Sequence, residues 1–379
     1  MASANVMSGL PALLAEIGHV LVTGVRDVYR DFAEISFKGP QASLASKTAL
    51  AVVISTGIAC AMHLPEVWWA AISAIMCSQA TRPASVRKGI LRIIGTVAGA
   101  ALSLALVGWI AYDHAACSLV LLTVATVGVL GIIVSPHGYA WLLGAITFVL
   151  VVLMSLANPL DALNYASFRV IEVCVGTLTA MAVAIALAPP GGDSAPAPPG
   201  WTNLLGERWP AVLHALRGGI AVALIPYMWD WLEISDIAPV AVTIAAVMAA
   251  PVLADHPLDD GRQIVQKALH RLIGCLLGGI PALLLLGLSF DSLVPWLGVL
   301  SIGIWLFAWQ AGSQRGTGYV GNQALLVFAM TIVQGEGPPG SIMPGINRLI
   351  GIVLGMTVLF GVCLIVQPAP PEREPAAPR

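Results

Sequence analysis

Apolar stretches long enough to cross a lipid bilayer recur along almost the whole of this sequence. A helix needs about 20 apolar residues to span the hydrocarbon core, and such stretches fill residues 47–188 and 213–366. Hydrophobic residues make up 58% of the chain and charged residues only 10%, whereas soluble domains carry about 25% charged residues. The sequence therefore predicts an all-α polytopic membrane protein with the lipid bilayer as its surroundings, and it excludes an intrinsically disordered chain.

About twelve transmembrane helices are predicted, in two groups of six. The first group is expected at residues 47–63, 66–80, 89–111, 117–135, 139–157 and 167–188. The second group is expected at residues 213–229, 236–253, 268–289, 293–311, 319–335 and 346–366.

Composition divides the chain into five segments. Glu16 and His19 interrupt the first apolar run, which favours an amphipathic helix on the cytoplasmic surface over a secretory signal. The Pro- and Gly-rich stretch between the two groups is typical of a semi-rigid linker, and the Pro-rich tail is typical of disorder. The predicted segments are an N-terminal segment 1–45, a first membrane repeat 46–188, a linker 189–210, a second membrane repeat 211–367 and a tail 368–379.

The basic residues predict the orientation. Cytoplasmic loops carry an excess of Lys and Arg. With the N-terminus inside, all 18 Lys and Arg residues except Arg169 and Arg348 fall on the cytoplasmic side. Both termini are therefore expected in the cytoplasm.

One sequence frame occurs four times. The pattern Arg-x-x-Gly-x-x-x-Gly begins at Arg92, Arg271 and Arg348, and it begins at Arg169 with Glu172 in place of the first glycine. The interval between the two copies is the same in each half, since 169 − 92 = 77 and 348 − 271 = 77. This predicts two parallel six-helix repeats, each built of two inverted three-helix units, an arrangement known from secondary transporters.

The frame itself suggests a role for each residue type. Glycines four apart let two helices approach closely in lipid, and the Arg lies on the same face one turn earlier. Such an Arg either anchors the helix among lipid headgroups or, as part of a set of guanidinium groups, binds the carboxylate of a transported anion. We take Arg92, Arg169, Arg271 and Arg348 as candidate substrate-binding residues.

Two further polar positions lie inside apolar runs. Glu172 replaces a glycine about one turn inside its span, where it is expected either to pair with an arginine or to carry a proton during transport. Asn322 and Gln323 lie inside another span and either bond between helices or line the substrate path. We take Glu172 as a candidate proton-coupling residue and the two amides as candidate substrate contacts.

Other functions find little support in the sequence. Gly316, Gly318 and Gly321 fit a GxGxxG pattern, but no predicted strand surrounds them, and no phosphate-binding GxxxxGK[ST] motif occurs. HExxH, GxSxG and CxxC motifs are absent too, so we expect neither an enzyme nor a cofactor or metal site. A net charge of −2 without a basic cluster predicts no nucleic-acid partner.

Two stretches resemble a known family. The segment His63-Leu-Pro-Glu-Val-Trp-Trp-Ala-Ala-Ile-Ser-Ala, followed by Arg87-Lys88-Gly89 and by the frame at Arg92, is similar to the fusaric acid resistance family, as is the frame at Arg169 and Glu172. The resemblance extends over both membrane groups, roughly residues 45 to 366. Larger members carry a sizeable cytoplasmic domain, whereas this chain has only the linker.

The resemblance implies an efflux transporter for small organic anions, with aromatic carboxylic acids as the leading substrates, in a bacterial inner membrane. Members of the family often work with a periplasmic adaptor subunit. We expect the proton-motive force to drive export. A passive anion channel is an alternative, because the superfamily resembles plant malate channels, and a non-transporting membrane scaffold is another. A homo-oligomer is compatible with the sequence but not required by it.

Overall fold

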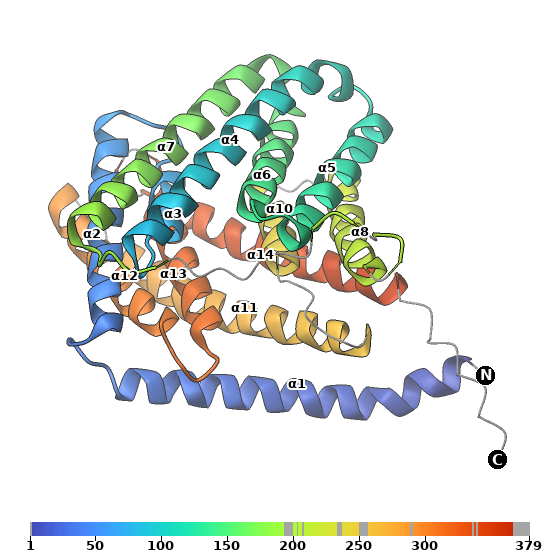
Figure 1. Cartoon of the computed structure of the whole chain (residues 1–379), viewed down its shortest axis with the longest axis horizontal. Helices are drawn as coiled ribbons and strands as arrows, with labels where there is room; N and C mark the ends of the chain where they lie inside the picture. The colour runs from blue at the N-terminus through green and yellow to red at the C-terminus, as the bar shows by residue number, and fades with distance from the viewer. Residues whose placement is uncertain are drawn as a thin grey trace.

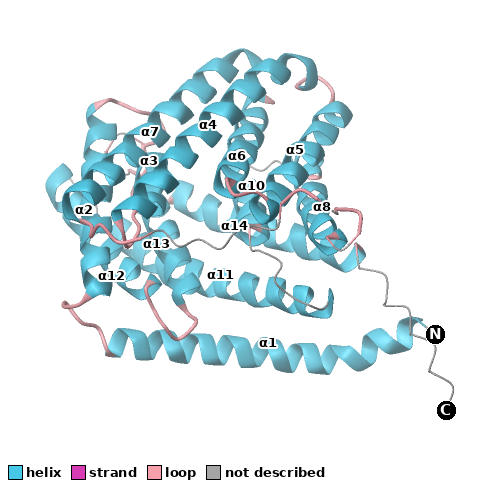
Figure 2. Ribbon diagram, viewed as in Figure 1, coloured by secondary structure: helices cyan, strands magenta, loops and turns pink. Residues whose placement is uncertain are grey.

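The protein is helical throughout the part that the structure describes. This structure is a computed structural model, and it describes residues 2–192, 200–202, 204–206, 208–232, 237–249, 257–288, 290, 292–335, 337–338 and 340–366. Figures 1 and 2 show long helices packed side by side, joined by short turns. The tail 368–379 and most of the predicted linker's proline-rich centre lie outside the described residues.

The helices follow one another in close succession. The first half of the chain contains α1 (Ala2–Ala33), α2 (Pro40–Ala61), α3 (Trp68–Cys77), α4 (Arg82–Ile110), α5 (His114–Val134), α6 (Gly138–Ser155), a 3₁₀ turn (Pro159–Asp161) and α7 (Ala162–Leu187). The second half contains α8 (Trp209–Ala223), α9 (Ile225–Leu232), α10 (Ala238–Met248), α11 (Pro257–Leu286), α12 (Leu293–Ala311), α13 (Gly318–Ile332) and α14 (Met343–Ile365).

Nine helical segments of the described chain are long and apolar enough to cross a membrane. Three further apolar helices, α3, α10 and α13, contain only 10, 11 and 15 residues. At about 1.5 Å per residue, none of the three reaches the roughly 30 Å thickness of the hydrocarbon core. They lie where the second, eighth and eleventh spans are expected, so the count of twelve crossings stays a prediction.

Helices from the two halves pack against each other in a matched way. The first helix of the first half, α2, packs along α12, the fourth helix of the second half, and α8 in turn packs along α5. Figure 1 shows these two pairs at opposite sides of the molecule. Large buried side chains such as Trp296, Phe148 and Phe328 fill the interior between them.

The segment before each half covers the turn between the fourth and fifth helices of the other half. In one case, the N–H of Gly200 donates to the carbonyl of Val134 at 3.0 Å, and Trp201 packs edge-on against Trp141. In the other, α1 runs beside α11 (Figure 1) and its buried Asp31 meets the turn between α12 and α13.

Asp31 is the centre of a polar cluster on that turn. Its carboxylate accepts hydrogen bonds from Thr317 at 2.7 Å, from Gln310 at 3.0 Å and from Arg315 at 2.5 Å. Arg315 also bonds Glu34, and these two acidic partners raise the pKa of its guanidinium. The end of α1 is therefore fixed to the second half of the molecule; its predicted cytoplasmic position stays a prediction.

Candidate functional site

The glycines of the repeated frame lie where helix backbones touch. A Cβ at Gly99 of α4 would overlap the carbonyl of Gly144 of α6, and a Cβ at Gly278 of α11 would overlap the carbonyl of Ala324 of α13. Only a residue without a side chain permits this approach. The third helix of each half is therefore packed directly on the fifth helix.

The sixth helices use the same frame against the short helices. A Cβ at Gly176 of α7 would overlap the carbonyl of Ala70 in α3, and a Cβ at Gly355 of α14 would come within 2.7 Å of the carbonyl oxygen of Val240 in α10. The frame therefore brings each arginine-bearing helix to the centre of its half, and α3 and α10 are enclosed there.

Arg92 is buried between these short and fifth helices, with 3% of its surface exposed. Its Nε donates to the hydroxyl of Ser73 in α3 at 3.1 Å, and its Nη1 donates to the hydroxyl of Tyr139 in α6 at 2.7 Å. Both acceptors are neutral, so they solvate the guanidinium without balancing its charge.

Arg271 has an equivalent environment in the second half. Its Nη2 donates to the hydroxyl of Thr243 in α10 at 3.1 Å, and its Nη1 donates to the side-chain oxygen of Gln323 in α13. Only 4% of Arg271 is exposed. The structure thus brings Arg271 and Gln323 together, again with neutral acceptors, whereas the neighbouring Asn322 is half-buried on a different side of α13.

Arg169 and Arg348 come from different halves but lie on one pair of aromatic rings. The guanidinium of Arg169 lies 3.7 Å from the ring centroid of Trp69, and that of Arg348 lies 4.6 Å from the centroid of Trp68. The two indoles are 4.0 Å apart at the start of α3. Both arginines are buried within the protein, which is not the position of a side chain that extends to lipid headgroups.

Glu172 lies at the N-terminus of α3. It is buried, with 1% exposed, and its Oε1 accepts the backbone N–H of Glu66 at 2.8 Å. A helix N-terminus carries unpaired N–H groups and a partial positive charge, so it stabilises a carboxylate there. Arg169 and Glu66 are the charged side chains whose fields act on Glu172.

Three of the four arginines therefore converge on α3, through Ser73, Trp69 and Trp68. The sequence did not single out Ser73, Thr243 or Tyr139 as site residues. The only signal for them was the shared Gly-Tyr at the start of the fifth and eleventh spans. The hydroxyls of the short helices gave no signal, because a Ser or Thr in an apolar helix usually bonds its own backbone.

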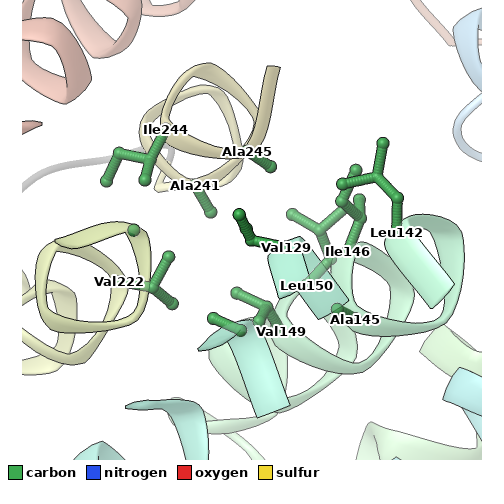
Figure 3. Close-up of a pocket in the computed structure, with 12 residues that line it drawn as sticks. Val129, Leu142, Ala145, Ile146, Val149, Leu150, Val222, Ala241, Ile244 and Ala245 are labelled. Atoms are coloured by element: carbon green, nitrogen blue, oxygen red, sulfur yellow. The ribbon is translucent and has the colours of Figure 1, made fainter. Parts of the chain in front are cut away.

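An apolar cavity lies between the halves, away from the arginines. It has a volume of ≈ 20 Å³ and is enclosed by α5, α6, α8 and α10, with side chains such as Val129, Val149 and Ile244 pointing into it (Figure 3). That is room for about one water, and the lining offers no polar side chain to hold it. We therefore place the candidate site at α3 and α10 and not in this cavity.

Residues 42–198 match the model of the fusaric acid resistance protein family. The protein is a membrane protein of the fusaric acid resistance type. The match covers the first six membrane helices with α3, Arg92, Arg169 and Glu172, and it supports a function in membrane transport. No curated protein and no solved structure matches the chain. The expected resemblance of the second membrane group stays a prediction.

Proposed function

We propose that the protein is an inner-membrane efflux transporter for small organic anions, with aromatic carboxylic acids as the leading substrates. One observation carries the proposal: Arg92 and Arg271 are buried, and the acceptors that the described residues offer them are uncharged hydroxyl and amide oxygens. A buried charge without a counter-ion is costly. A carboxylate that binds both nitrogens of a guanidinium would supply the missing charge.

The two halves are proposed to be parallel repeats that contribute twelve crossings in total. The matched seams of Gly99 and Gly278, and the matched bonds of Arg92 and Arg271, support this arrangement. In such transporters the substrate site lies at the repeat interface and is formed by interrupted helices. The short helices α3 and α10 correspond to that description.

Glu172 is proposed as the proton-coupling residue. A carboxylate buried in a bilayer is a functional candidate by default, and Glu172 is within the field of Arg169, a proposed substrate-binding residue. A proton on Glu172 would change the charge balance around Arg169. Substrate binding and protonation would then influence each other through a single arginine.

The test is uptake into proteoliposomes of aromatic and dicarboxylic acids, with and without an imposed pH gradient. We expect saturable, concentrative movement of aromatic carboxylates that disappears when the gradient is collapsed. Glu172→Gln should abolish the response to the gradient and leave folded protein in the membrane. Asn322→Ala is the matched control, because Asn322 does not contact an arginine in the described structure.

The other outcomes point to the alternative functions. Downhill current that ignores the pH gradient would identify a passive anion channel. Absence of flux for every acid would contradict the transporter proposal and favour a scaffold. A periplasmic adaptor or a homo-oligomer would then be sought by co-purification and by measuring the mass of the detergent-solubilised particle.

A further inference from the structure

A lysine accompanies the arginine on both third helices. Lys88 precedes Arg92 by four residues on α4, and Lys267 precedes Arg271 by four residues on α11. Side chains four apart on a helix are neighbours on one face. Each half thus places two positive charges in succession along the helix that carries its buried arginine.

Both lysines contact the same aromatic side chain of the fifth helix. The Nζ of Lys88 lies 5.1 Å from the ring centroid of Tyr139, and the Nζ of Lys267 lies 5.3 Å from that of Tyr319. A cation over a ring face is held by the ring's quadrupole. The tyrosine therefore fixes each ammonium beside the path that leads to the arginine, and Tyr139 at the same time bonds Arg92.

Neither ammonium is balanced by an acid in the described part of the chain. No carboxylate there lies within 4.0 Å of Lys88 or Lys267, and neither ammonium donates a hydrogen bond to a described residue. Both lysines are half-buried, and the like charge of Arg92 acts on Lys88. Like charges four apart destabilise a helix, yet the arrangement occurs in both halves. Each ammonium keeps its donors available for an anion.

We propose that Lys88 and Lys267 bind the carboxylate of the transported anion before it reaches Arg92 and Arg271. The proposal rests on the proposed function and extends it, because it assigns the first binding step to two residues on the face predicted to be cytoplasmic. Each half then holds two successive anion contacts. The first is a mobile, half-exposed ammonium and the second is a buried guanidinium with a fixed geometry.

The experiment measures binding of 4-hydroxybenzoate to the purified full-length protein by isothermal titration calorimetry, followed by flux in proteoliposomes. Lys88→Gln and Lys267→Gln should each weaken binding by about five- to tenfold, since each removes one nearby charge. Lys88→Arg should bind as the unsubstituted protein does. In flux, the half-saturating concentration should rise on the lysine-bearing face, while the maximal rate changes little.

Lys38→Gln is the matched control, because Lys38 is an exposed lysine just before α2 and contacts no tyrosine ring in the described structure. Lys88→Met, which keeps the apolar stem, repeats the test if the glutamine variant does not fold. Unchanged binding in Lys88→Gln and Lys267→Gln, with weakened binding in Arg92→Gln, would overturn the lysine proposal alone. Binding that depends on the lysines, without any flux, would contradict the transporter and retain the site.

Discussion

The seam between α7 and α3 and the seam between α14 and α10 use the same frame for different purposes. In the second half Gly351 lies against Pro239, where a Cβ would come within 2.9 Å of the proline Cβ. In the first half the corresponding frame position is Glu172, whose carboxylate accepts a backbone N–H at the start of α3. One seam is a packing contact, and the other holds a buried charge.

The aromatic pair changes together with the carboxylate. Where α10 begins with Ala238 and Pro239, α3 begins with Trp68 and Trp69, and these indoles hold Arg169 and Arg348. The backbone frame therefore tolerates two different side-chain sets as long as the deeper glycines, Gly176 and Gly355, keep the helices in contact. The comparison indicates that the first half carries the specialised site, on a scaffold that both halves share.

The largest expected effect tests the shared scaffold. Gly99→Ala and Gly278→Ala each place a methyl group on a neighbouring carbonyl, so the helices must separate, at a cost of about 3 kcal/mol or more. We expect loss of folded protein after detergent extraction and a large fall in the unfolding temperature. Gly108→Ala on the same α4 helix meets nothing within 4 Å and should be neutral or slightly stabilising. Equal stability of the three variants would contradict the seams.

A second exchange tests whether the two seams are equivalent. Gly351→Glu would force a side chain against Pro239 and bury a charge, which costs several kcal/mol. Glu172→Gly removes a side chain from a position that already has room for one. We expect the first variant to unfold and the second to remain folded without gradient-driven flux, as judged by size-exclusion chromatography and uptake. Comparable stability of the two variants would contradict the proposed difference.

A third comparison concerns the buried arginines. Arg92→Gln and Arg271→Gln each remove a charge-assisted contact worth about 1.5–3 kcal/mol, so we expect roughly tenfold or greater weakening of 4-hydroxybenzoate binding. Similar losses in the calorimetric titration would indicate that both halves contact the anion. A loss confined to Arg92→Gln would restrict the site to the first half, and no loss in either variant would contradict the account.

The smallest expected effect concerns the indoles. Trp69→Leu and Trp68→Leu each remove a cation–π contact worth about 1–2 kcal/mol at a buried site. We expect a modest rise in the half-saturating anion concentration, with folded protein retained. Trp305→Leu, on α12 and away from the arginines, is the matched control. An equal effect of all three substitutions would show that the indoles act only through packing.

Much of the helical framework could be predicted from the sequence, because apolar length and composition determine where helices enter a bilayer. The repeated frame also identified Arg92, Arg169, Arg271 and Arg348 before their surroundings were known. The shortness of α3 and α10 was not predictable, since an apolar run gives no measure of where a buried helix ends. The meeting of Arg169 with Arg348 on adjacent indoles depends on contacts between halves, and local sequence contains no signal for them.

The most direct test of the account is the structure of the protein with bound 4-iodobenzoate, whose iodine can be located by its anomalous scattering. The account predicts a carboxylate within hydrogen-bond distance of one of the buried guanidinium groups at α3 or α10, with the iodinated ring beside it. Iodine in the apolar cavity between α5, α6, α8 and α10, or only at the lipid-facing surface, would contradict it.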